Sequence, residues 1–126
     1  MKIKKLTGKL IAIDMYNCCA AILNDADAAE KALEQACLDF SMQPCQIIRN
    51  QEEDQNEYSL FAICKRGHVT AHIYPEEGFV AADVYSFYEN SDPAGMARYL
   101  RTYFDADKSK ITLLDRGDFG TESDMK

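Results

Sequence analysis

The sequence lacks several features that would point at once to a class of protein. It has no tryptophan, only three prolines, and no apolar run near the roughly 18 residues that a membrane span requires. Its basic start, MKIKKLTGK, is not followed by the apolar stretch and small-residue cleavage site of a signal peptide. The formal net charge is −7, whereas phosphate binding needs clustered Lys and Arg. We therefore expect a cytoplasmic protein that neither crosses a membrane nor binds nucleic acid.

Motifs built on glycine or cysteine are missing as well. The six glycines are scattered and form no phosphate-binding loop. The five cysteines are odd in number and have no C-x-x-C spacing, so we expect free thiols in a reducing compartment. The length predicts one domain over residues 1–116, followed by a flexible tail over 117–126.

Hydrophobic periodicity predicts the order β-α-β-β-β-β-α-β. Strands are expected over 9–16, 45–50 and 58–65, in a hairpin over 66–87, and in a short edge strand over 111–114. Helices are expected over 27–40, with Asn24 or Asp25 as N-cap, and from Asp92-Pro93 onward. The polar run 51–57 is expected to be an exposed loop. The predicted fold is α+β, a two-layer sandwich of a mainly antiparallel sheet with both helices on one face, the other face being covered by a second copy.

The hairpin gathers most of the residues that could carry chemistry. His68, Thr70 and His72 alternate with apolar residues, and Pro75-Glu76-Glu77-Gly78 supplies a tight turn. Asp83, on the return strand, is expected to be a buried carboxylate. It is either hydrogen-bonded at a strand edge or in contact with a substrate.

Two kinds of site are disfavoured by spacing. His68 and His72 share a strand face but stand about 13 Å apart, too far for one metal ion. Cys64 is close to His68 in sequence, but no third group is identifiable to orient a cysteine–histidine pair. We expect no metal site and no cysteine nucleophile.

The hairpin contains three short motifs: RGHVTAH at 66–72, YPE at 74–76 and AADV at 81–84. Together with Gly8-Lys9, Asp14, Tyr16, Cys18, Leu23-Asn24-Asp25 and Asp92-Pro93, they resemble the prokaryotic S-adenosylmethionine decarboxylase family. The resemblance covers residues 7–115 and implies that family's fold. It also implies its chemistry, in which a serine cuts its own chain and becomes a pyruvoyl group, the electron sink for decarboxylation.

The resemblance places the family's catalytic positions at Gly67, His72, Phe87 and Ser59. The cleaving serine is replaced by Gly67, the preceding glutamate by Arg66, and the proton-donating cysteine by Phe87. His72 and Ser59 match family residues that are still present. Because glycine has no Oγ, we expect no pyruvoyl group at Gly67 and no other cofactor. Ligand-binding positions are expected at Glu76, Asp83 and His68.

The sequence thus predicts a protein similar to S-adenosylmethionine decarboxylase, unprocessed and catalytically inactive. Its expected role is regulatory or ligand-binding, linked to polyamine (spermidine) biosynthesis. The expected partners are a second copy, or an active paralogue in a heterodimer, and the expected ligand is S-adenosylmethionine or a polyamine. Two alternatives stay open: an active decarboxylase of this family working by an unexpected route, and a different enzyme or structural protein on the same fold.

Overall fold

A computed structural model of the chain describes residues 6–53, 55–117, 123 and 125. Its elements, in chain order, are β1 (Gly8–Tyr16), α1 (Ala20–Leu23), α2 (Ala26–Asp39), β2 (Pro44–Asn50), β3 (Tyr58–Cys64), β4 (Gly67–Tyr74), the 3₁₀ turn η1 (Pro75–Glu77), β5 (Phe79–Ser86), α3 (Pro93–Tyr103) and β6 (Lys108–Arg116).

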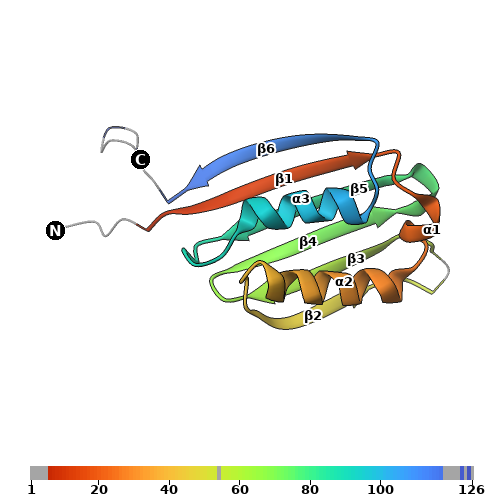
Figure 1. Cartoon of the computed structure of the whole chain (residues 1–126), viewed down its shortest axis with the longest axis horizontal. Coiled ribbons are helices and arrows are strands. Elements are labelled where there is room, and N and C mark those ends of the chain that lie inside the picture. Colours follow the sequence, from red (N-terminus) through yellow and green to blue (C-terminus); the bar gives the residue numbers. More distant parts are fainter. Residues whose placement is uncertain (1–5, 54, 118–122, 124, 126) are drawn as a thin grey trace.

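The six strands form one sheet in the order β2-β3-β4-β5-β1-β6, with antiparallel pairing throughout. The helices all lie on one side of this sheet (Figure 1). The β4–β5 hairpin is central, and β2 and β6 are the two edges. The predicted two-layer α+β fold is therefore confirmed, and the opposite sheet face carries no described element. We call that second surface the open face.

The core lies between the sheet and the helices. Alternate strand residues point toward α2 and α3, so the strands show a period-2 burial pattern. The largest fully buried side chains are Ile13, Met15, Leu23, Met42, Leu60, Ile73 and Met96. Alanines of α2 such as Ala29 and Ala36 are buried as well, which lets this helix approach the sheet closely.

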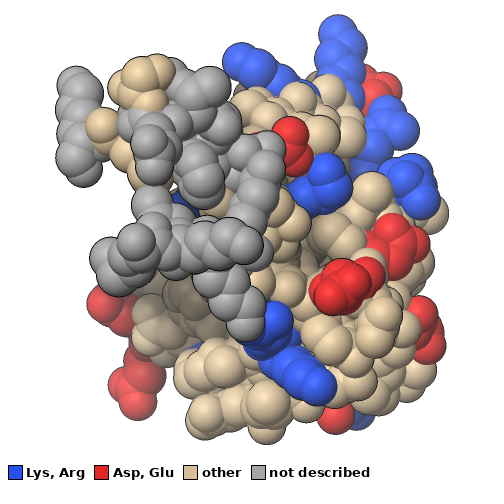
Figure 2. Space-filling model, turned by 90° about the vertical axis from the view of Figure 1, so that its left-hand side faces the viewer, with Lys and Arg blue, Asp and Glu red and all other residues tan. Residues whose placement is uncertain are grey.

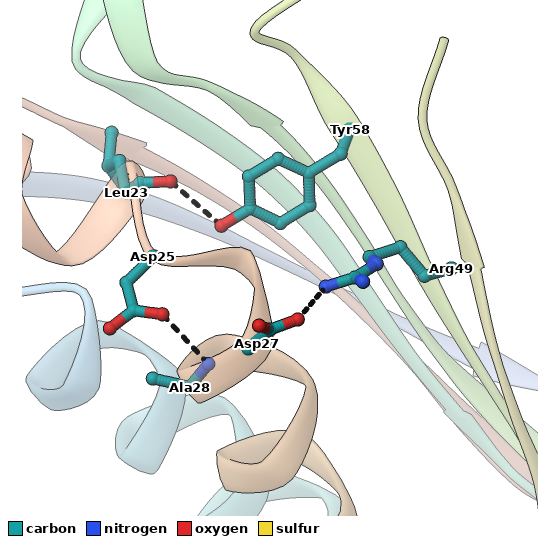
Figure 3. A network of polar contacts seen from close by, with 6 residues as sticks. All are labelled: Leu23, Asp25, Asp27, Ala28, Arg49 and Tyr58. Carbon is teal, nitrogen blue, oxygen red and sulfur yellow. Dashed lines mark hydrogen bonds and ion pairs between the residues drawn. The ribbon is translucent and has the colours of Figure 1, made fainter. Parts of the chain in front are cut away.

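Local signals fix where the two long helices begin. The carboxylate of Asp25 accepts a hydrogen bond from Ala28 N, and that of Asp92 accepts one from Gly95 N. Figure 3 shows how the start of α2 is also tied to the sheet. There the Tyr58 hydroxyl donates to the Leu23 carbonyl at 2.8 Å, and Arg49 pairs with Asp27 at 2.7 Å.

Two expectations about elements were wrong. The short helix α1 was not predicted, because four residues after Cys19 are too few to show helical periodicity. The last strand runs over nine residues rather than four, although its edge position was predicted correctly. It is longer because β1 offers a backbone partner along its whole length, a tertiary contact that a local pattern does not show.

Other expectations concern the ends of the chain and the membrane. The predicted tail over 117–126 falls mostly outside the described residues. Within the described part of the chain, no helix is long and apolar enough to cross a membrane.

Candidate functional site

The hairpin residues singled out from sequence lie on the open face. On β4 these are His68, Thr70 and His72, each half-buried, while their neighbours Val69, Ala71 and Ile73 are buried against the helices. Asp83 on β5 lies opposite Thr70, and its side chain is exposed. The expectation of a buried Asp83 was therefore wrong. Its apolar neighbours Ala82 and Val84 face the core, and the pleat turns the carboxylate the other way.

One pair of predicted positions is in direct contact. Ser59 on β3 is opposite His72 on β4, and the Ser59 Oγ lies 2.7 Å from the His72 Nδ1. The ring of Phe61 packs edge-on against the His72 ring, with centroids 5.8 Å apart. A hydroxyl and an imidazole at this distance form a hydrogen bond. The pair can therefore donate a proton to a group placed above it, or accept a proton from that group.

The backbone around Gly67 leaves no room for a side chain. Cys64 pairs with Gly67 across a two-residue turn, in which Arg66 adopts a left-handed conformation with φ 55°. Phe87 N donates to the Arg66 carbonyl at 2.8 Å, which holds the turn against β5. A Cβ built on Gly67 would stand 2.2 Å from the carbonyl oxygen of Tyr85, far inside contact distance.

Phe87 follows directly on β5 and fills the end of the sheet. Its ring would stand 2.6 Å from a Cβ built on Gly8, so glycine at position 8 makes room for it. The ring also packs on Tyr85 with centroids 5.2 Å apart. Beside Phe87 lies a cavity of about 430 Å³, whose wall includes Lys9, Ser91 and Arg116.

The four positions that the resemblance assigned to catalysis form two groups, which are far apart within one chain. His72 is five residues along β4 from Gly67, a separation of about 16 Å at 3.3 Å per strand residue. Ser59 lies with His72, and Phe87 lies with Gly67. A single copy therefore does not bring these four positions together.

His68, the other predicted ligand position, is held by aromatic stacking. Its ring lies parallel to that of Tyr85, with centroids 4.8 Å apart and an angle of 13° between planes. The guanidinium of Arg116 lies 5.8 Å from the Tyr85 ring centroid. The β6 residue Arg116 and the His68 ring thus both contact Tyr85. His68 and His72 share a face as predicted, and among the described residues no three potential ligands form a metal-binding group.

Glu76 lines a cavity at the opposite end of the hairpin from Gly67. This cavity, of about 280 Å³, lies between the turn and the loop after β2, and its lining includes Glu57 and Glu77. A second cavity of about 150 Å³ adjoins it and is lined by Glu52, Ser59 and Tyr74, among others. The sequence showed both acidic segments but gave no sign that they meet. Their meeting depends on how the loop folds back over the hairpin.

The cysteines are free thiols, as expected. Burial raises the pKa of Cys18 to about 11, helped by the nearby Asp105 carboxylate. A hydrogen bond between the Cys37 and Cys64 thiols raises the pKa of Cys37 and lowers that of Cys64. Cys64 is buried on the helix side of the sheet, whereas His68 lies on the open face. The two side chains therefore do not meet.

Comparison with known proteins shows which protein family the chain belongs to. The family model described as S-adenosylmethionine decarboxylase matches residues 9–117. The chain belongs to the S-adenosylmethionine decarboxylase family. This confirms the resemblance noted from the hairpin motifs.

Relatives in this family include bacterial proteins named S-adenosylmethionine decarboxylase proenzyme. The one from Acetivibrio thermocellus is 29% identical over 112 residues, covering 89% of this chain and 90% of the relative. The one from Moorella thermoacetica is 27% identical over 110 residues, covering 87% of each. The crystal structure of the adenosylmethionine decarboxylase from Aquifex aeolicus superimposes with a TM-score of 0.80 at 20% identity, covering 90% of this chain and 93% of the other. The fold is therefore that of the family.

Proposed function

We propose that this chain is an unprocessed member of the S-adenosylmethionine decarboxylase family that acts by binding rather than by decarboxylation, in the regulation of polyamine biosynthesis in the cytoplasm. The observation that carries the proposal is the geometry at Gly67. This residue has no Oγ, and its Cα stands so close to the Tyr85 carbonyl that a Cβ would be 2.2 Å from the oxygen.

The residues present do not fit a pyruvoyl group. Formation of the group starts with attack by a serine hydroxyl on the preceding carbonyl, and position 67 supplies neither a hydroxyl nor space for one. The Arg66 carbonyl that such a hydroxyl would attack accepts a hydrogen bond from Phe87 N, but residue 67 has no nucleophile to reach it. Phe87 itself has no proton to give, whereas the resemblance implies a cysteine there. Two separate requirements of the reaction are missing.

The ligand that the site favours is a cation. The two adjoining cavities near the turn carry Glu52, Glu57, Glu76 and Glu77, and the ring of Tyr74 lines one of them. Carboxylates attract ammonium and sulfonium groups, and an aromatic ring face adds cation–π attraction. Polyamines and S-adenosylmethionine both carry such positive groups. We propose that one of them binds here.

The partner that the open face favours is another chain of the same fold. Several aromatic rings on this face are partly exposed: those of Tyr16, Phe61, Tyr74, Phe79 and Tyr85. Two such sheets pack face to face and bury their aromatic side chains. An antiparallel copy would also bring the Ser59–His72 end of one face over the Gly67–Phe87 end of the other. A homodimer, or a heterodimer with an active paralogue, is thus the proposed assembly.

Intact-mass spectrometry and a ligand screen test the proposal together. The purified protein is expected to run as one species of 14.2 kDa, with no pyruvoyl-terminated fragment. Spermidine, putrescine and S-adenosylmethionine are then compared in a thermal-shift assay, because a ligand of the native state raises the melting temperature. Glu57→Gln/Glu76→Gln should lose the shift, while Glu34→Gln on α2 should keep it. Two fragments, or equal shifts in both variants, would refute the proposal.

One observation favours a second candidate, an active decarboxylase working by another route. The Ser59–His72 pair keeps a 2.7 Å contact on the open face, ready to move a proton. Release of carbon dioxide from labelled S-adenosylmethionine, abolished by borohydride or hydroxylamine and by His72→Asn, would establish this alternative. No release above that of a denatured control would exclude it.

A further inference from the structure

The two edges of the sheet are built differently. The β2 edge begins with Pro44, which has no N–H to offer a further strand, and its pairing shifts register between Pro44 and Gln46. Arg49 on this strand is engaged by Asp27 at 2.7 Å, and Ile48 is its only strongly exposed large apolar residue. Proline, an irregular register and charge are devices that keep an edge strand from pairing with another chain. The β2 edge is therefore protected.

The β6 edge has none of these devices except charge near its ends. All nine of its residues pair in continuous register with β1, and none is proline. Three large apolar side chains are more than half exposed, Ile111 at 53%, Leu113 at 56% and Leu114 at 52%. In the described part of the chain no strand lies beyond β6 (Figure 1). A long, regular edge with exposed apolar side chains is a template for a further strand.

We propose that the outer edge of β6 pairs antiparallel with β6 of a second copy, across a twofold axis at Thr112. Such an axis, perpendicular to the sheet, keeps the open faces of both copies on the same side. The register must then pair residues whose numbers share a parity, since successive strand residues alternate between faces. Centring on Thr112 sets Ile111 of each copy opposite Leu113 of the other. Registers centred on Ile111 or Leu113 do not place these two residues opposite each other.

This register forms an apolar cluster from side chains that one copy leaves in water. Two Ile111 and two Leu113 side chains meet on the helix side of the joined sheet. Cross-strand pairs of β-branched and aliphatic residues stabilise a sheet. On the open face, Thr112 meets its own copy at the axis. The edge is therefore complementary to itself, which points to a second copy of this chain as the partner.

Charges set the salt dependence of the contact. At the two ends of the pairing, Lys108 of one copy lies opposite Arg116 of the other, an exposed like-charge pair that salt screens. The other two charged residues of β6 face β1 of their own chain. Lys110 lies opposite Asp14 in the strand register, and Asp115 forms an ion pair with Lys9 at 3.1 Å. Added salt is therefore expected to strengthen the edge contact. An interface made by ion pairs would weaken instead.

The edge contact is separate from the proposed packing of open faces. It uses backbone groups of β6 and the side chains Ile111 and Leu113, which do not lie on the open face. One copy can therefore use both surfaces, and the two together would give a tetramer. A strand pair alone is small beside the roughly 1,000 Å² typical of stable interfaces, so the edge step is expected to depend on concentration.

Sedimentation velocity and native mass spectrometry over a concentration series test this inference. The edge variant is Ile111→Lys/Leu113→Lys, with Leu113→Thr as a milder change that keeps strand propensity. Leu38→Lys is the matched control, because Leu38 on α2 is 57% exposed but far from the edge. Thr70→Arg on the open face removes the other interface. Circular dichroism confirms that each variant is folded.

The expected result is that the edge variants lose one association step, with a dissociation constant raised by about tenfold or more, while Leu38→Lys behaves as the unaltered protein. Salt should not dissociate that step. Equal association of edge variants and unaltered protein overturns the inference, as does a purely monomeric Thr70→Arg protein. In that last case the open-face dimer stands. If instead only the edge variants dissociate, the edge contact stands and the proposed face-to-face dimer fails.

Discussion

Adding a side chain at position 67 is the sharpest test of the proposal that this chain does not process itself. The change is Gly67→Ser, with Gly67→Ala as its matched control, since both add a Cβ and only serine adds an Oγ. The Cβ would stand 2.2 Å from the Tyr85 carbonyl oxygen, whereas ordinary contact starts at 3.4 Å. The end of β4 must therefore move about 1.2 Å away from β5, the difference of those two distances.

The size of the effect follows from what that movement disturbs. It strains the hydrogen bond from Phe87 N to the Arg66 carbonyl, 2.8 Å long, and the last pair of the β4–β5 ladder, Gly67 with Ser86. Forcing atoms into a packed site costs about 1–3 kcal/mol. Removing glycine returns about 0.4–1 kcal/mol by restricting the unfolded chain. We expect a net loss of about 1–2 kcal/mol in the free energy of unfolding.

Differential scanning calorimetry and intact-mass spectrometry measure the two consequences. For a chain of this length, each kcal/mol lowers the melting temperature by about 3–6 °C, and both variants should fall by similar amounts. Both should stay at the full chain mass, because a serine displaced by crowding is not aligned to attack the Arg66 carbonyl. Adding Phe87→Cys to Gly67→Ser should not change that outcome. Self-cleavage of Gly67→Ser would refute the reasoning, and an unchanged melting temperature of Gly67→Ala would show that the close approach does not exist.

Three further predictions concern stability and thiol chemistry. Tyr58→Phe removes the hydrogen bond to the Leu23 carbonyl and should cost about 1 kcal/mol in urea unfolding. Burial raises the pKa of Tyr58 to about 12, whereas the value in the unfolded chain is 10. The contribution of the Tyr58 side chain to the free energy of unfolding is therefore complete below pH 10 and is lost as the pH rises from 10 to 12. The phenylalanine variant should lose less stability over that pH range. Asp92→Ala removes the cap of α3 and should cost about 0.5–2 kcal/mol, seen as a lower melting temperature. Exposed Cys45 should react with iodoacetamide well before buried Cys37, and equal rates by peptide mapping would contradict the burial of Cys37.

Much of the candidate site was accessible from the sequence. The motifs at 66–72, 74–76 and 81–84 identified the family, and the alternation of His68, Thr70 and His72 placed them on one strand face. The Ser59–His72 contact was not predicted as such. The pattern gives the face of each residue, but the register between β3 and β4 decides which residues lie opposite each other.

The sequence by itself determined the local elements of this protein: the central hairpin, the starts of the long helices at Asp25 and Asp92, and the glycine where the family's serine is expected. Those features depend on side-chain chemistry and spacing within a few residues, so they can be read along the chain. Only the tertiary structure decided that Asp83 is exposed, that Ser59–His72 and Gly67–Phe87 lie at opposite ends of one face, and that β6 extends to a full-length edge. Each of these depends on which distant segment lies alongside, because burial and close approach are set by the neighbouring strand or helix and not by the residue alone.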